Sequence, residues 1–283
     1  MKSLSRDEIT QFVAGALAED VGSGDATTLA TVPEDARAEA VFMPREAMVL
    51  CGVELAENTF RLLSPTIDLE RHYEDGRQVS VGSPLLTVRG STRAILTAER
   101  VALNLMQRLS GIATLTAQFV EAVQGNPARV LDTRKTTPHW RALEKYAVRC
   151  GGGQNHRSGL FDMVLIKDNH LQALQNEMPS AIHAAVTRAR AAYPALKVEV
   201  EADTLEQVEQ ALDAGADIIL LDNMTLEQLG SAVRLATGRA KTEASGGVTL
   251  DTVRGIAATG VDFISVGALT HSARSVDIGL DFL

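Results

Sequence analysis

Polar residues or glycines follow each of six short apolar segments in the second half of this 283-residue chain. If these segments are parallel strands, their carboxyl ends meet on one face, and residues far apart in the sequence converge there. The alternative, that they are unrelated solvated loop residues, does not explain why all six segments end alike. We therefore expect one functional site, built from residues 132–135, 167–170, 201, 222–223, 245–247 and 267.

The stretch 133–170 is basic although the chain has a net charge of -9: it holds seven Lys or Arg and three Asp or Glu, a difference of +4. Cations confined in one cleft repel each other unless anions bind between them. Arg134 and Arg157 offer planar forks that match carboxylate or phosphate oxygens, whereas Lys135 and Lys167 act as point charges. We expect a substrate with several negative charges.

Glu201 and Asp222 end two consecutive segments and supply negative charge on the same predicted face. Such a pair suits a divalent cation, ribose hydroxyls or positive charge developing at an anomeric carbon. Magnesium held by two carboxylates would keep water and substrate oxygens as its other ligands.

Ser245-Gly246-Gly247 and Gly267 end the last two segments. Small residues at this position in a barrel let backbone N–H groups approach a phosphate, although a plain turn would also suit a glycine pair. Three glycines precede His156 in the loop 151–157, which indicates close approach to a ligand or a closing loop rather than a simple linker. His156 suits binding better than acid–base catalysis, and both readings stay open.

Three similar helices position these groups. Thr204, Thr225 and Thr249 each precede an amphipathic stretch as a helix N-cap, and two of the stretches run into Gly-Ala-Asp or Gly-Val-Asp. Strands alternating with such helices predict parallel strands with right-handed crossovers, either a barrel or a doubly wound sheet.

The first 90 residues predict a smaller α+β unit. Ser5 and Glu8 have capping-box spacing before a helix, and a loop spans 19–28. Strands are expected at 38–51, 67–73 and 84–89, and a long helix at 92–123 with an interruption at Ser110-Gly111.

Composition excludes several classes of protein. A negative net charge argues against broad binding to nucleic acid or anionic membranes. We expect neither a membrane span nor a signal peptide, since no apolar run is long enough for a span and the stretch 1–10 is polar. We therefore expect a cytoplasmic protein. Cys51 and Cys150 form no CxxC pair, so neither a disulfide framework nor a cysteine zinc site is indicated, and Cys150 is expected to be buried or incidental.

At these residues the chain resembles the quinolinate phosphoribosyltransferases, also called nicotinate-nucleotide pyrophosphorylases (carboxylating). His139-Trp140 stands where that family commonly has Gly-Leu, which could alter the shape of the pocket. The matching segments, in the same order along nearly the whole chain, are 19–28, 99–114, 131–137, 143–170, 221–223, 243–248 and 260–272.

The resemblance implies an α/β fold with an N-terminal α/β sandwich (1–112), an incomplete barrel of six or seven strands (113–270) and a C-terminal segment (271–283) that returns to the first domain. It also implies a homodimer in which Arg100 reaches the partner's site. Quinolinate would react with phosphoribosyl pyrophosphate and Mg²⁺ to give nicotinate mononucleotide, pyrophosphate and CO₂ in de novo NAD biosynthesis. Lys135, Glu201 and Asp222 would be the catalytic residues, and the last two the metal ligands. The implied substrate-binding residues are Arg100, Thr133, Arg134, Lys135, His156, Arg157, Lys167, Glu201, Asp222, Ser245, Gly246, Gly247, Gly267 and Ala268.

Three other functions fit parts of the pattern. A paralogous phosphoribosyltransferase with another acceptor, such as the type associated with molybdenum uptake, would share most of these residues. A barrel aldolase would use Lys167 as a Schiff base. A sensor of phosphate ligands would bind without catalysis.

Overall fold

The computed structural model describes residues 4–283, which divide into two compact units. The first unit contains the chain up to Ala117, Ala142–Gly152 and Ser272–Leu283, and the second contains Gln118–Arg141 and Gly153–His271. Helix α5 (Arg141–Cys150) therefore groups almost entirely with the first unit, although the strands before and after it in the sequence belong to the second.

The first unit opens with the predicted capped helix, α1 (Arg6–Val21). The Ser5 hydroxyl accepts the Glu8 N–H, and the Glu8 carboxylate accepts the Ser5 N–H at 2.8 Å, so a capping box starts the helix. The predicted loop 19–28 is shorter than expected. Helix α1 runs to Val21, and Asp25 caps a second helix, α2 (Ala26–Thr31), by accepting the Thr28 N–H.

The sheet of the first unit has four antiparallel strands in the order β12-β1-β5-β3, so the C-terminal strand pairs with the first one. The single strand predicted at 38–51 is two strands, because Arg45 and Glu46 leave the sheet to bond the backbone of Asp277. The short β4 was not predicted. It pairs with β2 in a separate two-stranded antiparallel sheet. The strands of the first unit are β1 (Arg37–Pro44), β2 (Met48–Val49), β3 (Asp68–Arg71), β4 (Gln78–Val79), β5 (Leu86–Ser91) and β12 (Ile278–Phe282).

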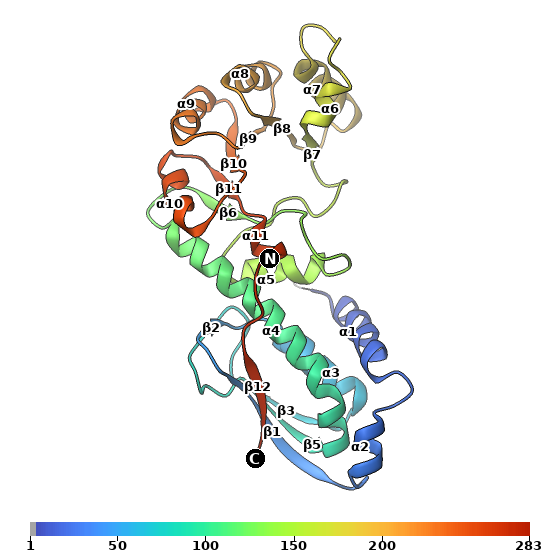
Figure 1. Ribbon diagram of the computed structural model, residues 1–283. Helices are drawn as coiled ribbons and strands as arrows, with labels where there is room; N and C mark the ends of the chain where they lie inside the picture. Colours follow the sequence, from blue (N-terminus) through green and yellow to red (C-terminus); the bar gives the residue numbers. More distant parts are fainter. Residues whose placement is uncertain (1–3) are drawn as a thin grey trace. The chain divides into compact units, whose positions relative to one another are not determined.

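The hydrophobic core of the first unit contains residues of the sheet and of two helices, α3 (Val53–Leu63) and α4 (Thr92–Ala122). Phe42 of β1 meets Phe60 of α3 edge to face at 5.9 Å, and α4 extends as one long helix in Figure 1. The interruption predicted at Ser110-Gly111 was wrong. Gly111 serves packing instead: a Cβ there would lie 1.9 Å from the carbonyl oxygen of Arg274.

The second unit is built on six parallel strands in the order β6-β11-β10-β9-β8-β7. The first strand of the unit pairs with the last, as in a barrel, and only a bridge from Leu131 to Gln154 adjoins the other edge of β6. This arrangement confirms the predicted incomplete barrel. The strands are β6 (Arg129–Leu131), β7 (Val164–Ile166), β8 (Val198–Ala202), β9 (Ile218–Asp222), β10 (Lys241–Ser245) and β11 (Phe263–Ser265).

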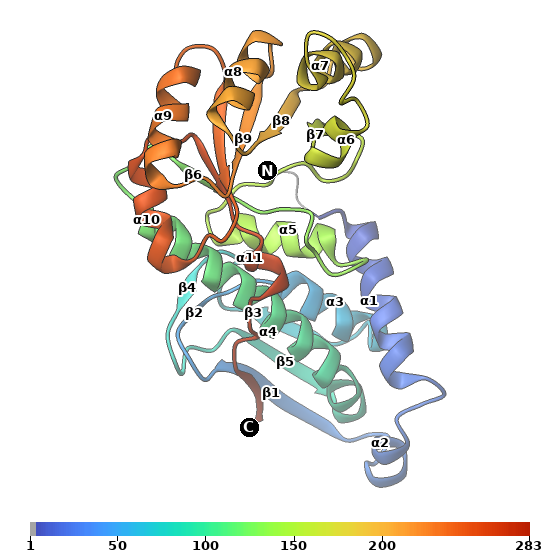
Figure 2. The ribbon, with the colours of Figure 1, turned by 45° about the horizontal axis from the view of Figure 1, so that its top comes forward.

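Helices connect these strands, and Figure 2 shows α8 and α9 side by side along them. The three predicted threonine caps are confirmed, because the Thr204, Thr225 and Thr249 hydroxyls each accept an N–H from three residues ahead. None of the helices in residues 4–283 combines the length and apolar character that a membrane crossing requires. The helices of the second unit are α6 (Asp168–Gln172), α7 (Ala181–Ala192), α8 (Leu205–Asp213), α9 (Leu226–Ala236), α10 (Leu250–Ala258) and α11 (Ala268–His271).

Candidate active site

A cavity of about 770 Å³ opens at the carboxyl ends of the six parallel strands. All but one of the predicted binding residues line it, as does Asn223, which follows Asp222. Convergence of this kind is what parallel strands impose on residues at their carboxyl ends. The predicted residues at the cavity wall are Thr133, Arg134, Lys135, His156, Arg157, Lys167, Glu201, Asp222, Ser245, Gly246, Gly247, Gly267 and Ala268.

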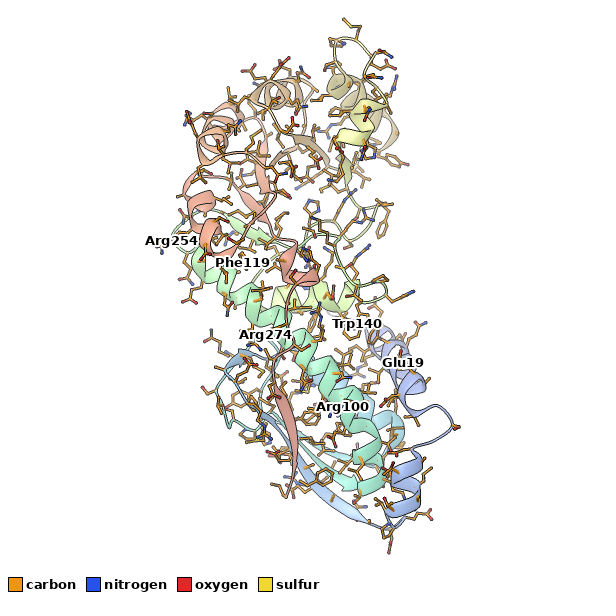
Figure 3. All side chains as sticks on the ribbon, viewed as in Figure 1. Glu19, Arg100, Phe119, Trp140, Arg254 and Arg274 are labelled. Carbon is orange, nitrogen blue, oxygen red and sulfur yellow. The ribbon has the colours of Figure 1, made fainter. Side chains whose placement is uncertain are left out.

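Arg100 is the exception. It lies on α4 in the first unit, where Figure 3 labels it, and its side chain is exposed. It does not line the cavity of its own barrel. A contribution of Arg100 to a partner's site stays a prediction.

Asp132, a buried residue just after β6, fixes the loop that carries His156 and Arg157. Its carboxylate accepts the backbone N–H of His156 at 2.9 Å and the side-chain amide of Asn155 at 2.5 Å. Two segments more than twenty residues apart in the sequence are thus joined at the cavity edge. The following turn is held by the Thr133 hydroxyl, which accepts the Lys135 N–H at 3.0 Å.

The cationic side of the cavity is poised for an anion. The Nε of Arg134 is buried and has no hydrogen-bond partner within residues 4–283, which is costly for a guanidinium unless a ligand supplies an acceptor. Burial, and the positive charge of Arg134, lower the pKa of Arg157. A ligand carrying carboxylates or phosphates would supply the acceptor that Arg134 Nε lacks and would offset the repulsion between Arg134 and Arg157.

The acidic side lies at the ends of β8 and β9. Burial, and the negative charge of Glu201, raise the pKa of Asp222, whose carboxylate also accepts the Asn223 side-chain amide at 2.7 Å. Lys167 contacts the Glu201 carboxylate and so offsets part of this charge. Two neighbouring carboxylates are a suitable donor set for Mg²⁺, which prefers oxygen ligands.

The loop after β10 is wound tightly against the end of β9. Gly246 and Gly247 have φ values of +98° and +58°, and a Cβ on Gly246 would lie 2.1 Å from the Asn223 Oδ1. Only glycine fits Gly246 without displacing that amide. The loop then leads into the capped N-terminus of α10, where free backbone N–H groups favour an anion.

Gly267 keeps space for Lys135. A Cβ at Gly267 would lie 3.1 Å from Lys135 Cδ and 3.1 Å from His271 Nε2. The Lys135 carbonyl also accepts the Thr270 hydroxyl at 2.8 Å. The end of β11 therefore positions the lysine that follows β6.

A largely buried triad of His156, Glu199 and Glu243 lies at the floor of the cavity, which His156 and Glu243 line. His156 Nε2 is 3.0 Å from a Glu199 oxygen and 3.6 Å from a Glu243 oxygen, and its Nδ1 accepts the Arg157 N–H at 2.8 Å. Because Nδ1 accepts, the ring proton sits on Nε2, and the imidazole links the backbone of Arg157 to the barrel interior. Burial, and the charge of Glu199, raise the pKa of Glu243 to about 8.

Sequence reasoning missed Glu199 and Glu243. The spacing of the residues could have revealed both acids. Glu199 is two residues before Glu201, and Glu243 is two residues before Ser245. Residues two apart in a strand share one face, so an acid at the strand end implies that the earlier acid also faces the interior.

His139, the departure from the family pattern, does not line the cavity. It is exposed and has a φ of +66°, in the left-handed region that glycine adopts freely. A glycine, which the family commonly has at this position, would adopt the same backbone conformation without strain. Histidine in its place therefore affects the backbone energy of the turn and leaves the residues that line the cavity unchanged.

Comparison with known proteins identifies both parts of the chain. Residues 25–110 match the N-terminal domain of quinolinate phosphoribosyl transferase, and residues 112–281 match its C-terminal domain. A nicotinate-nucleotide pyrophosphorylase (carboxylating) from Mycobacterium leprae is 45% identical over 97% of each chain. A probable enzyme of the same name from Bacillus subtilis is 41% identical over 93% of this chain and 89% of its own. The solved nicotinate-nucleotide pyrophosphorylase from Francisella tularensis superimposes with a TM-score of 0.93 at 40% identity, covering 99% of this chain and 98% of that one.

Proposed function

Because the chain belongs to the quinolinate phosphoribosyltransferase family, we propose that it transfers the phosphoribosyl group of phosphoribosyl pyrophosphate to quinolinate with decarboxylation. The products are nicotinate mononucleotide, pyrophosphate and CO₂, as in de novo NAD biosynthesis. The observation that carries this proposal is the cavity itself. On one side it has an Arg134 nitrogen that finds no acceptor among the described residues 4–283, and on the other side it has the Glu201–Asp222 pair.

The cationic side suits quinolinate. Its two carboxylates are adjacent on a planar ring, and the forks of Arg134 and Arg157 match carboxylate geometry better than a lysine would. His156 would bind the ring from the cavity floor, and its bond to the Arg157 N–H would keep that arginine in place. Arg134 Nε would then gain its missing acceptor.

The opposite side suits the sugar phosphate. Ser245, Gly246 and Gly247, with Gly267 and Ala268, would hold the 5-phosphate through backbone N–H groups at the ends of β10 and β11. Thr133, Lys135 and Lys167 would contact the pyrophosphate.

Glu201 and Asp222 would hold Mg²⁺ together with phosphoribosyl pyrophosphate. The bound ion would neutralise charge on the leaving pyrophosphate. The burial that raises the pKa of Asp222 supports this assignment, since a cation at that point lowers the cost of two nearby negative charges.

The reaction then needs mainly positioning and charge. The pyridine nitrogen bonds to the anomeric carbon while the bond from that carbon to pyrophosphate breaks, and its electron pair leaves with the pyrophosphate. Glu201 and Asp222 would stabilise positive charge on the sugar, and Lys135 the negative leaving group. Loss of the carboxylate next to the nitrogen as CO₂ leaves its bonding electrons in the pyridinium ring, and a solvent proton takes its place.

The pairing of Lys167 disfavours the aldolase alternative. Its amine contacts the Glu201 carboxylate, so the nitrogen that would have to attack a substrate carbonyl is already engaged in an ion pair. Borohydride trapping of a carbonyl substrate on Lys167 would overturn our assignment.

We also place the enzyme in the cytoplasm as a homodimer in which Arg100 of each chain completes the partner's cavity. The exposure of Arg100 on α4 supports this arrangement.

An acceptor panel tests the function. The pure protein, phosphoribosyl pyrophosphate and Mg²⁺ are incubated with quinolinate or with other pyridine and aromatic acids, and nucleotide products are measured. We expect product from quinolinate far above the others. Preference for another acceptor would identify a paralogous transferase, and binding without product would indicate a sensor.

A further inference from the structure

Two cysteines lie together in the first unit, and neither of them lines the cavity of the second unit. Cys51 is in the loop between β2 and α3, and Cys150 is the last residue of α5. Their sulfur atoms and a carboxylate oxygen of Asp75 all lie within 4.8 Å of one another. Cys51 is fully buried and Cys150 is partly exposed, so Cys150 is the less protected of the two residues.

Asp75 has a structural task that makes the trio a poor metal site. Its carboxylate accepts the N–H groups of Gly52 at 3.0 Å and Val53 at 3.1 Å, and thus anchors the start of α3. It also accepts the Tyr146 hydroxyl at 2.7 Å. A metal would compete with all three bonds and find only two sulfurs in addition, so the chemistry of the cluster is that of a dithiol.

The two thiols differ in mobility. The Cys51 backbone is fixed at both ends, since its N–H donates to the Ser110 hydroxyl at 2.9 Å and its carbonyl accepts that hydroxyl at 3.1 Å. Cys150 ends its helix and is followed by three glycines. A sulfur–sulfur bond of about 2.05 Å therefore requires movement mainly of Cys150.

They also differ in reactivity. A hydrogen bond from Cys51 lowers the pKa of the Cys150 thiol, with further help from Tyr146 and Arg149 and against burial and Asp75. Burial raises the pKa of Cys51 well above its usual value. An accessible sulfur with a lowered pKa beside a buried thiol is the arrangement in which one cysteine attacks and the other resolves.

We propose that Cys51 and Cys150 form an intramolecular disulfide by exchange with small disulfides such as oxidised glutathione. The Cys150 thiolate attacks the glutathione disulfide and forms a mixed disulfide, and one glutathione leaves as a thiolate. The Cys51 sulfur then attacks the Cys150 sulfur and displaces the second glutathione, which departs as a thiol with the proton that Cys51 gives up. The protein loses two electrons and two protons, and one glutathione disulfide is reduced to two thiols.

The bond would act on the segment that leads to the proposed active site. Cys150 stands six residues before His156, and Gly151-Gly152-Gly153 lies between them. Gly151 packs closely against α4, because a Cβ there would lie 2.3 Å from the Ala113 carbonyl oxygen. Formation of the disulfide would therefore displace the start of the segment that connects Cys150 to the loop bearing His156 and Arg157.

The test uses the folded full-length protein, reduced and freed of metal by a chelator, in glutathione buffers of graded ratio. Free thiols are alkylated at each ratio, and intact mass and peptide maps are recorded. We expect a species that has lost two hydrogens, in which the Cys51 and Cys150 peptides are linked. The ratio of this species to the reduced protein should rise in proportion to the concentration of glutathione disulfide divided by the square of the glutathione concentration.

Matched variants assign the order of attack. Cys51→Ala should accumulate glutathione on Cys150, because the resolving thiol is missing, whereas Cys150→Ala should leave Cys51 unmodified in the folded state. Wild-type protein that keeps glutathione on Cys150, or that retains both thiols while its denatured form reacts, would overturn the proposal. If one variant fails to fold, the mass and peptide map of the wild-type protein still decide whether the disulfide forms.

Discussion

The Nε2–H group of His156 donates a hydrogen bond to the buried carboxylate of Glu199, with 3.0 Å between the nitrogen and the oxygen. With Nδ1 occupied by the Arg157 N–H, the ring connects the cavity loop to the barrel interior. His156→Ala should therefore do two things. It should lower the free energy of unfolding by roughly 1–3 kcal/mol, because Glu199 loses a buried partner, and it should raise KM for quinolinate through misplacement of Arg157. Denaturant titration and initial rates measure both. If KM rises while the free energy of unfolding stays unchanged, His156 contributes to substrate binding but its hydrogen bond to Glu199 does not stabilise the fold, which would contradict the proposed link.

Glu243 predicts a pH dependence of stability. Its pKa rises from an ordinary carboxyl value to about 8 on folding, so between these two values the folded state holds a proton that the unfolded state has released. The free energy of unfolding should fall as pH rises through this window, and this contribution is lost above pH about 8. Glu243→Gln, which keeps the shape and cannot ionise, should flatten the decline in urea titrations between pH about 5 and about 9. An equal slope in both proteins would contradict the assignment.

Lys135 and Arg134 supply charge that the proposed reaction requires. Lys135→Ala or Arg134→Ala should reduce turnover by roughly 10²-fold or more, as removal of other preorganised charge-stabilising groups does. Lys241→Ala is the matched control, since Lys241 starts β10, away from the carboxyl ends, and is paired with Asp262. Initial rates should be near wild type for the control alone. Comparable loss in all three variants would indicate a general effect of charge.

Gly246 tests the proposed phosphate loop. Gly246→Ala places a Cβ 2.1 Å from the Asn223 Oδ1 and should raise KM for phosphoribosyl pyrophosphate much more than KM for quinolinate. Gly238→Ala is the control, because it also has a positive φ but meets nothing within 4 Å. Both variants carry a backbone strain of about 1–2 kcal/mol. Similar kinetics in the two variants would mean that strain, and not the loop, causes the change.

Arg100 tests the shared cavity. Inactive Arg100→Ala chains mixed with inactive Lys135→Ala chains should recover activity, because one cavity of each mixed dimer receives both wild-type residues. Dimers are formed by refolding or exchange and verified by a mass tag. If verified mixed dimers stay inactive, Arg100 does not act on a partner's cavity.

The carboxyl ends of the strands could be predicted because a parallel sheet brings them to one face whatever the lengths of the connections. Glu201, Asp222 and Lys135 were found in this way. Glu199 and Glu243 were missed because the strands were treated as apolar segments, although alternation places these acids inside the barrel. Gly111 was misread as a helix break, since local sequence does not reveal that the Arg274 carbonyl packs against it. The nearness of Cys51 to Cys150 depends on tertiary structure alone.

One measurement tests the central claim most directly. Quinolinate labelled in the carboxylate next to the ring nitrogen is supplied with phosphoribosyl pyrophosphate and Mg²⁺, and labelled CO₂ is counted against nicotinate mononucleotide. The wild-type protein should release both in equal amounts, and Lys135→Ala should suppress both together. Absence of nucleotide from the folded wild-type protein, or nucleotide without release of the label, would contradict the proposed reaction.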